Sequence, residues 1–293
     1  MSRKEKPSDR FIDFCSERER IRIRRSAGLT PPHSDCHVLN TYRFCNIDRE
    51  HDAVTMWIEK NVRQFLHRVP LAHAVAAVFT ARVFNEPEVL KHIDFNEFDV
   101  DKWYDVADEM QKDGKIVFRS AYLTVSKKRG VSSVTYHRWI TTRIELCEFF
   151  DGTTPMETLG ELHYTLEGIE GIGPFMANQV IADFRHIGSM RVASDWETCV
   201  HFGPGTKRGL NRYFGSHHDT SRTENASRKM FNSLSKDMTD LFDQEHSGTI
   251  YPPFSPIFSD PNNLANALCE FDKYERAYDK INDNKKPTGR LWK

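Results

Sequence analysis

Residues 166–182, LEGIEGIGPFMANQVIA, constrain the fold of this chain more than any other stretch. Gly168, Gly171 and Gly173 stand where a backbone must turn sharply and be approached closely. Pro174 suits the first position of a new helix, and the apolar residues after it recur at helical spacing. The stretch therefore predicts two helices joined by a tight hairpin, whose backbone N–H groups and helix N-terminus suit a phosphate oxygen.

An aspartate follows the hairpin at a fixed distance. Asp195 lies 13 residues beyond position 182, in the run SDWETCV at 194–200. Hairpin and run together resemble the helix-hairpin-helix and catalytic Asp of the DNA glycosylase superfamily. The resemblance implies a mostly α, glycosylase-like helical fold, with Asp195 catalytic and Gly171 and Gly173 against the DNA backbone. The alternative is a Gly-rich helix connection followed by an ordinary loop aspartate.

Composition excludes several classes of protein. The six cysteines are scattered without a Cys-x-x-Cys pair, which indicates neither a zinc ribbon nor a disulfide framework. No apolar run approaches about 18 residues, so no membrane span is expected. The groups His33-x-x-Cys36-His37 and His217-His218 lack the further ligands of a four-coordinate site. We therefore expect no metal, no cofactor and an intracellular, reducing location.

The organisation along the chain predicts a mostly α protein with at most one short β element. Residues 1–30, which include the basic run RERIRIRR at 18–25, predict a polar N-terminal arm. Residues 31–293 predict one glycosylase-like helical domain, with a core helix at 71–84 and a last helix at about 263–281. Strand character is confined to 115–126, and the main loops are expected at 203–211 and 246–261.

Three further stretches narrow the resemblance. They are TYRFCN at 41–46 with Arg49, Asp52 and Trp57 after it, the run from Ser194 to Leu210 containing GPGTKRGL, and LCEFDKYER at 268–276. With the hairpin they resemble the α-glutamyl/putrescinyl thymine pyrophosphorylase family, also called amino acid:DNA transferases, over roughly residues 20–280. The resemblance implies thymine hypermodification of double-stranded DNA, as encoded by bacteriophages and hence carried out in the host cytoplasm. A separate hydroxymethyluracil DNA kinase activates the base, and the transferase replaces the pyrophosphate with an amino acid or polyamine.

This reaction assigns roles to charged and polar side chains. A leaving pyrophosphate needs positive charge, for which Lys207, Arg208, Lys273 and Arg276 are candidates, and Gly205 joins them in a Gly-rich turn against DNA. Arg43, Arg49, Asn46 and Trp196 are candidates for binding the flipped base. Asp195 takes a proton from the amine, holds the ammonium or stabilises a cationic pyrimidine, and the sequence leaves these roles open. The competing interpretations are a helix N-cap for Asn46, a core position for Trp196 and a surface turn for Lys207 and Arg208.

Other functions remain open or are excluded by single residues. A monofunctional glycosylase would use the same Asp195, and a non-catalytic DNA-binding module would use only the hairpin. Lyase chemistry needs a lysine two residues after the last hairpin glycine, where this chain has Phe175. A phosphate-loop kinase needs Gly-Lys-Ser/Thr, whereas Gly209 is followed by Leu210.

Overall fold

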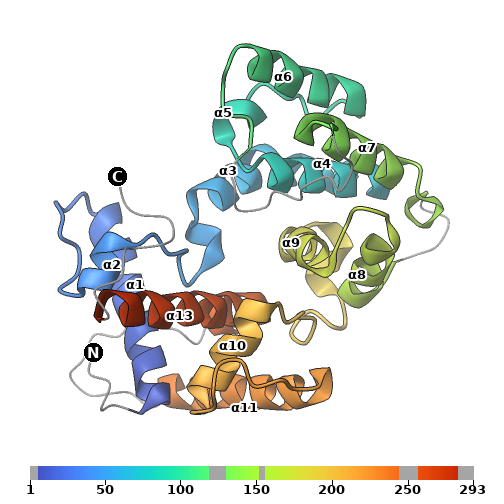
Figure 1. Ribbon diagram of the computed structural model, residues 1–293. Helices are drawn as coiled ribbons and strands as arrows, with labels where there is room; N and C mark the ends of the chain where they lie inside the picture. The colour runs from blue at the N-terminus through green and yellow to red at the C-terminus, as the bar shows by residue number, and fades with distance from the viewer. Residues whose placement is uncertain (1–5, 119–129, 152–155, 244–256, 283–293) are drawn as a thin grey trace. The chain divides into compact units, whose positions relative to one another are not determined.

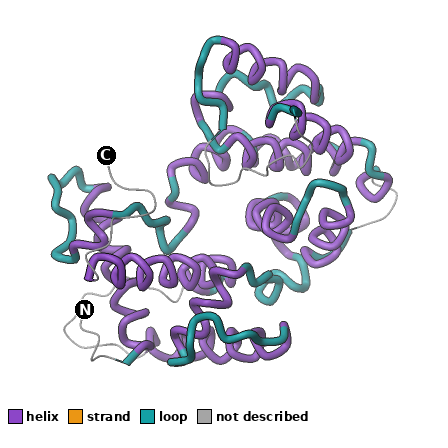
Figure 2. The backbone as a smooth tube through the Cα atoms, in the orientation of Figure 1, coloured by secondary structure: helices purple, strands orange, loops and turns teal. Residues whose placement is uncertain are grey.

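Every regular element of the described chain is a helix. The structure is a computed structural model that describes residues 6–118, 130–151, 156–243 and 257–282. Figure 2 shows helices joined by loops throughout these ranges, without a strand. The predicted mostly α class is therefore confirmed. Of the expected β element at 115–126, residues 115–118 are irregular and residues 119–126 lie outside the described ranges.

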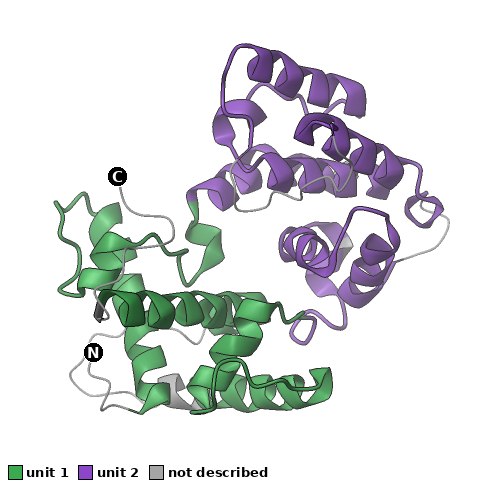
Figure 3. Ribbon diagram, viewed as in Figure 1, with its two compact units in different colours: residues 1–52, 200–293 green, residues 53–199 purple. Residues whose placement is uncertain are grey.

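The chain forms two compact units, which we describe separately (Figure 3). Unit 1 comprises residues 1–52 and 200–293, and unit 2 comprises residues 53–199. Each has its own cluster of buried apolar side chains. The middle of the chain thus builds one core and both ends build the other. The single glycosylase-like domain over 31–293 stays a prediction.

Unit 1 is organised around its C-terminal helix. Its elements are α1 (Pro7–Ser26), α2 (His37–Thr41), the 3-10 turn η1 (Arg49–His51), α10 (Pro204–Tyr213), α11 (Glu224–Asp243) and α13 (Pro261–Asn282). Helix α13 contacts α10, α1 and α2, as Figure 1 shows for this unit. The predicted last helix at about 263–281 corresponds to α13.

The residues expected to form a polar arm instead form α1. Phe11, Phe14, Cys15 and Ile21 are fully buried and recur at helical spacing between the charged residues. The basic run contributes to this packing, because the buried Arg18 donates hydrogen bonds to the backbone carbonyls of residues 44 and 45. The many charged residues therefore made an amphipathic helix look like a polar arm in the sequence. The apolar face of residues 7–26 belongs to the core of unit 1.

The predicted loop at 203–211 is helix α10. Pro204 occupies its first turn, and Gly205 and Gly209 are four residues apart on one face. A Cβ atom at Gly209 would lie 2.2 Å from the carbonyl oxygen of Leu268, and one at Gly205 would lie 2.3 Å from Sγ of Cys269. The glycines therefore let α10 approach α13 closely, which removes the basis for a Gly-rich anion-binding turn.

Unit 2 surrounds the apolar helix α4. Its elements are α3 (Ala53–Asn61), η2 (Arg63–Arg68), α4 (Leu71–Phe84), α5 (Pro87–Leu90), α6 (Val100–Lys112), α7 (Ser133–Glu145), η3 (Glu148–Phe150), α8 (Leu159–Gly168), α9 (Pro174–Phe184) and η4 (Gly188–Val192). The core helix expected at 71–84 matches α4, which contacts α7 and α9. No helix in the described ranges is long and apolar enough to cross a membrane.

A buried ion-pair network ties four elements of unit 2 together. The carboxylate of Asp183 on α9 is fully buried and accepts hydrogen bonds from Arg63 on η2 and Arg82 on α4. Arg82 also donates to the hydroxyl of Thr55 on α3. Because loss of one partner would leave a buried charge uncompensated, this network fixes α9 against the core.

Candidate functional site

The hairpin residues form two helices joined by a short connection. Helix α8 ends at Gly168 and α9 begins at Pro174, and the two helices contact each other. Gly171 has φ +99°, a region that disfavours side chains, and a Cβ atom there would lie 2.7 Å from Ile140 of α7. Gly173 is the N-cap of α9, with open space where its side chain would be. Gly171 is therefore explained by packing, whereas Gly173 presents accessible backbone at a helix N-terminus.

The hairpin segment itself carries no basic side chain. Residues 166–182 contain Glu167 and Glu170 but no lysine or arginine. Tyr164 of α8 and Phe175 of α9 expose 81% and 53% of their area, which is unusual for large side chains. A nucleic-acid contact here would therefore rest on backbone N–H groups and aromatic stacking rather than on charge.

Asp195 is anchored to the start of α8. Its two carboxylate oxygens accept hydrogen bonds from the backbone N–H groups of Leu159 (2.9 Å) and Gly160 (2.8 Å). These are among the first N–H groups of the helix, so the positive end of the helix dipole adds to the attraction. The same helix start carries a capping box between Thr158 and Glu161. Asp195 is thus held at a defined position, half-buried, by residues 35 and 36 positions earlier in the chain.

The anchored carboxylate of Asp195 keeps some capacity to bind a further group. Each carboxylate oxygen accepts one backbone N–H. Each carboxylate oxygen still has a second lone pair with which it can bind a cation. The anchored carboxylate can therefore still contact a positively charged group.

Trp196 is engaged within unit 2. Its indole N–H donates to the backbone carbonyl of the fully buried Arg185 (2.9 Å), and the Arg185 guanidinium lies over the indole ring at 4.4 Å. Arg185 also donates to the carbonyl of Trp196. This cation–π contact occupies one ring face, and the partly buried ring also packs against the apolar core of unit 2, as the core interpretation expects. Base stacking by Trp196 stays a prediction.

The predicted base-binding residues of unit 1 lie in the segment before η1. The Asn46 side chain donates to the carbonyl of His51 (2.8 Å), and its backbone N–H donates to Asp52 (3.0 Å), which closes the loop. Asp48, not Asn46, caps η1, so the N-cap interpretation of Asn46 is wrong. Arg43 is exposed, and Arg49 is held through its backbone N–H by Asn263 of α13 (3.1 Å).

The four predicted pyrophosphate-binding side chains have different partners. Lys207 pairs with Glu224 of α11 (2.8 Å), and Lys273 donates to Glu270 (3.1 Å) and to the carbonyl of Arg43. Arg208 and Arg276 both bond the carboxylate of Asp272, at 2.8 and 3.1 Å.

Two further residues belong to this cluster: Arg212 was not predicted as part of the site, and Asp272 was predicted to recognise the amine or to occupy a solvated helix face. Arg212 also bonds Asp272 (2.9 Å), and Asp272 itself is fully buried. Their signal in the sequence is the i, i+4 spacing of Arg208 with Arg212 and of Asp272 with Arg276.

The structure therefore sorts the predicted residues into two groups. Asp195, Trp196, Gly171 and Gly173 belong to unit 2. The predicted residues of unit 1 are Arg43, Asn46, Arg49, Gly205, Lys207, Arg208, Lys273 and Arg276. The contact of Gly205 with DNA stays a prediction, since its missing side chain is already explained by Cys269.

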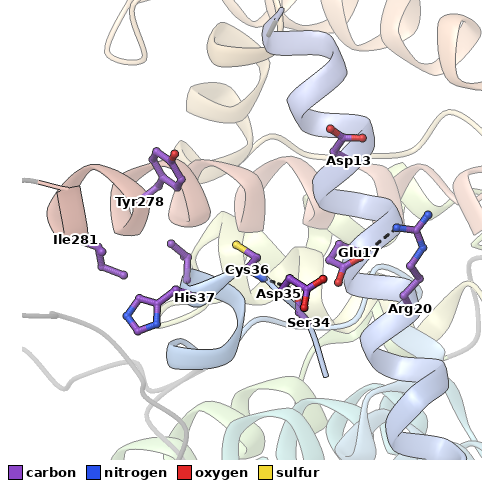
Figure 4. A pocket seen from close by; sticks show the side chains of 10 residues that line it. Asp13, Glu17, Arg20, Ser34, Asp35, Cys36, His37, Tyr278 and Ile281 are labelled. Carbon is purple, nitrogen blue, oxygen red and sulfur yellow. Dashed lines mark hydrogen bonds and ion pairs between the residues drawn. The ribbon is translucent and has the colours of Figure 1, made fainter. Parts of the chain in front are cut away.

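Unit 1 also contains a hollow of about 520 Å³ between α1, the start of α2 and the end of α13 (Figure 4). Asp13, Glu17 and Asp35 line it together with Tyr278, and Glu17 is paired with Arg20 (3.2 Å). The predicted site residues do not line this hollow.

The histidine groups differ in exposure. His33 is buried, while His37 is exposed. Ligand atoms of His217, His218 and Asp219 lie within 4.8 Å of one another at the surface. The expectation that the chain binds no metal stays a prediction.

Comparison with known proteins gives one match. A family model described as "5-hmdU DNA kinase, helical domain" matches residues 5–283, which is nearly the whole chain. No curated protein and no solved structure matches.

Proposed function

The chain belongs to the 5-hmdU DNA kinase helical-domain family, and on that premise we propose that it acts on DNA containing 5-hydroxymethyluracil or a derivative of that base. The match over residues 5–283 carries this proposal, because it connects both units to the same modified base. It also agrees with the base that the sequence resemblance implies.

We further propose that the reaction is replacement of pyrophosphate by an amine. The amine nitrogen forms a bond to the exocyclic methylene carbon, the bond from that carbon to oxygen breaks, and pyrophosphate leaves with the bonding electron pair. An ammonium co-substrate first releases one proton to free its lone pair, and after the new bond forms the nitrogen releases a second proton, both to solvent. Asp195 supports this chemistry because its anchored carboxylate can hold the ammonium group or stabilise a cationic pyrimidine.

Phosphoryl transfer from a nucleotide is less well supported by these residues. The GPGTKRGL run lacks the phosphate-loop signature, and its residues 204–210 are helical and packed on α13. We therefore place this chain at the step that follows activation of the base by a separate kinase.

A second candidate is a non-catalytic module that recognises the modified DNA for a kinase. The family description favours it, since it refers to one domain of a kinase. The engagement of both Asp195 oxygens with α8 also fits a purely structural aspartate.

Mass spectrometry of nucleosides distinguishes the candidates. Pyrophosphorylated DNA is incubated with the protein and a panel of amino acids and polyamines, then digested. The transferase predicts a nucleoside whose mass includes one amine. A glycosylase instead releases free base, and a recognition module binds the DNA but leaves all nucleosides unchanged; either result would overturn the transfer reaction.

A further inference from the structure

Three arginines of unit 1 converge on one buried carboxylate. Asp272 of α13 accepts hydrogen bonds from Nε of Arg208 (2.8 Å) and Arg212 (2.9 Å) of α10, and from Nε of Arg276 (3.1 Å) on its own helix. The Asp272 side chain has no exposed area, whereas those of Arg208 and Arg276 are 31% and 49% exposed. The carboxylate therefore lies beneath the guanidinium groups and holds them from below.

The arginines use only one nitrogen each for this contact. Within the described ranges, their terminal Nη groups make no hydrogen bond or ion pair. A guanidinium bound through Nε keeps its remaining N–H donors for another acceptor. The close packing of α10 on α13 through Gly205 and Gly209 brings Arg208 and Arg212 of α10 close to Arg276 of α13.

The cluster has an excess of positive charge. Burial alone would raise the pKa of Asp272. The hydrogen bonds from Arg208 and Arg212 and the charge of Arg276 lower the pKa by more than burial raises it, so the pKa lies below its ordinary value. Asp272 is therefore ionised at neutral pH, and its single negative charge faces three positive ones. The neighbouring lysines add no unbalanced positive charge, because Lys207 is paired with Glu224 and Lys273 with Glu270.

The open side of the cluster is at Arg208 and Arg276. Arg212, with 12% exposure, faces a hollow of about 390 Å³ whose wall also carries Glu275 and Asp279. These carboxylates make that hollow a poor place for an anion, although Glu275 is itself bonded to Arg10. An anion is therefore expected at the exposed ends of Arg208 and Arg276.

We propose that Arg208 and Arg276, held in place by Asp272 together with Arg212, form a binding site for a phosphoryl anion. Planar guanidinium groups match pairs of phosphoryl oxygens, and a preorganised cluster loses little side-chain entropy on binding. The phosphoryl group is either a free pyrophosphate, which rests on the proposed transfer reaction, or a phosphate of the DNA backbone. Asp272 acts as a positioning residue that does not touch the anion.

Direct binding of two probes tests the site without requiring turnover. Inorganic pyrophosphate is titrated calorimetrically, and an unmodified DNA duplex is titrated by fluorescence anisotropy, into wild type and Arg208→Gln/Arg276→Gln. Hydrogen bonds to charged groups contribute about 1.5–3 kcal/mol, so loss of these arginines should weaken binding by about tenfold or more. Lys229→Gln/Lys236→Gln, which removes two exposed positive charges from α11 of the same unit, is the matched control, and its affinities should stay within about twofold of wild type.

The pattern of losses identifies the source of the phosphoryl group. A loss confined to pyrophosphate assigns the site to the leaving group, and a loss confined to duplex DNA assigns it to the backbone. Unchanged affinities for both probes, or equal losses in the lysine control, would overturn the site. If the double variant unfolds by circular dichroism, Arg276→Gln alone is used, because two arginines then still neutralise Asp272. Arg276→Lys should restore part of the affinity if the role is binding.

This outcome is independent of the reaction. Pyrophosphate binding that depends on the arginines can persist when nucleoside analysis finds no amine transfer, and that combination would reject the transferase while supporting the site. Transfer with arginine-independent binding would do the reverse.

Discussion

Asp195→Asn should lower the stability of unit 2 as well as the rate of amine transfer. An asparagine keeps the size of the side chain but has one carbonyl oxygen, so it can accept from only one of the N–H groups of Leu159 and Gly160. Its NH₂ group would then face the other donor. A buried donor left without an acceptor costs about 1–3 kcal/mol, and loss of the charge at the helix N-terminus costs about 0.3–1 kcal/mol. The free energy of unfolding should therefore fall by about 1.5–4 kcal/mol.

Urea unfolding followed by circular dichroism measures this loss, and Glu197→Gln is the control. Glu197 is an exposed carboxylate two residues away, so its neutralisation should change the free energy of unfolding by no more than about 0.5 kcal/mol. At about 2–4 °C per kcal/mol, the Asp195 variant should also melt roughly 3–16 °C below wild type.

Turnover must be compared where both proteins are folded, for example at 15 °C. There the Asp195→Asn variant should transfer amine roughly 10²–10⁴-fold more slowly if the carboxylate stabilises positive charge during the reaction. A variant as stable as wild type would refute the helix-capping geometry. A destabilised variant with normal turnover would leave Asp195 as a structural cap and refute its place in the chemistry.

Three further changes test other parts of the account. Gly209→Ala should destabilise unit 1 by about 1–3 kcal/mol in thermal unfolding, since its Cβ would lie 2.2 Å from the carbonyl oxygen of Leu268, whereas Gly168→Ala, with open space, should be neutral or stabilising by up to about 1 kcal/mol. Equal effects would contradict the close packing of α10 on α13. Gly173→Glu has room for its side chain, so the protein should stay folded. The added negative charge should weaken DNA binding and make its salt dependence shallower. Unchanged DNA affinity at low salt would show that the hairpin does not touch DNA. Burial lowers the pKa of His137 to about 4, against an ordinary value of 6.5 in the unfolded chain, so stability present above pH 6.5 should be lost by up to about 3 kcal/mol as the pH falls to 4. His137→Asn should flatten that part of the pH profile, and an unchanged slope would reject the assignment.

Local patterns predicted those parts of the fold whose signals lie within one segment. The apolar run of α4 and the glycine and proline positions between α8 and α9 agree with the structure because local chemistry decides both. The helix α1 was missed because its apolar stripe is interrupted by arginines and glutamates that give the segment a polar average. Helix α10 was missed because glycines four residues apart read equally well as a loop until the partner helix is known.

The sequence names candidate site residues but not their arrangement. Asp195 is a candidate because of its spacing to the hairpin, but its bonds to α8 join residues about 35 positions apart, which no local pattern specifies. Arg208 and Arg276 were selected for their charge. Their common partner Asp272 depends on how α10 packs against α13, and the sequence shows neither that packing nor the pairing of Lys207 with Glu224.

The most direct test of the central claim is the stoichiometry of amine transfer. Pyrophosphorylated DNA is incubated with the protein and a ¹⁵N-labelled amine, without nucleotide, and pyrophosphate release and labelled nucleoside are quantified together. The account predicts one labelled nucleoside for each pyrophosphate released, with neither product formed when the protein is omitted. Release of pyrophosphate or free base without incorporation of the label, or no reaction across a panel of amines, would contradict it.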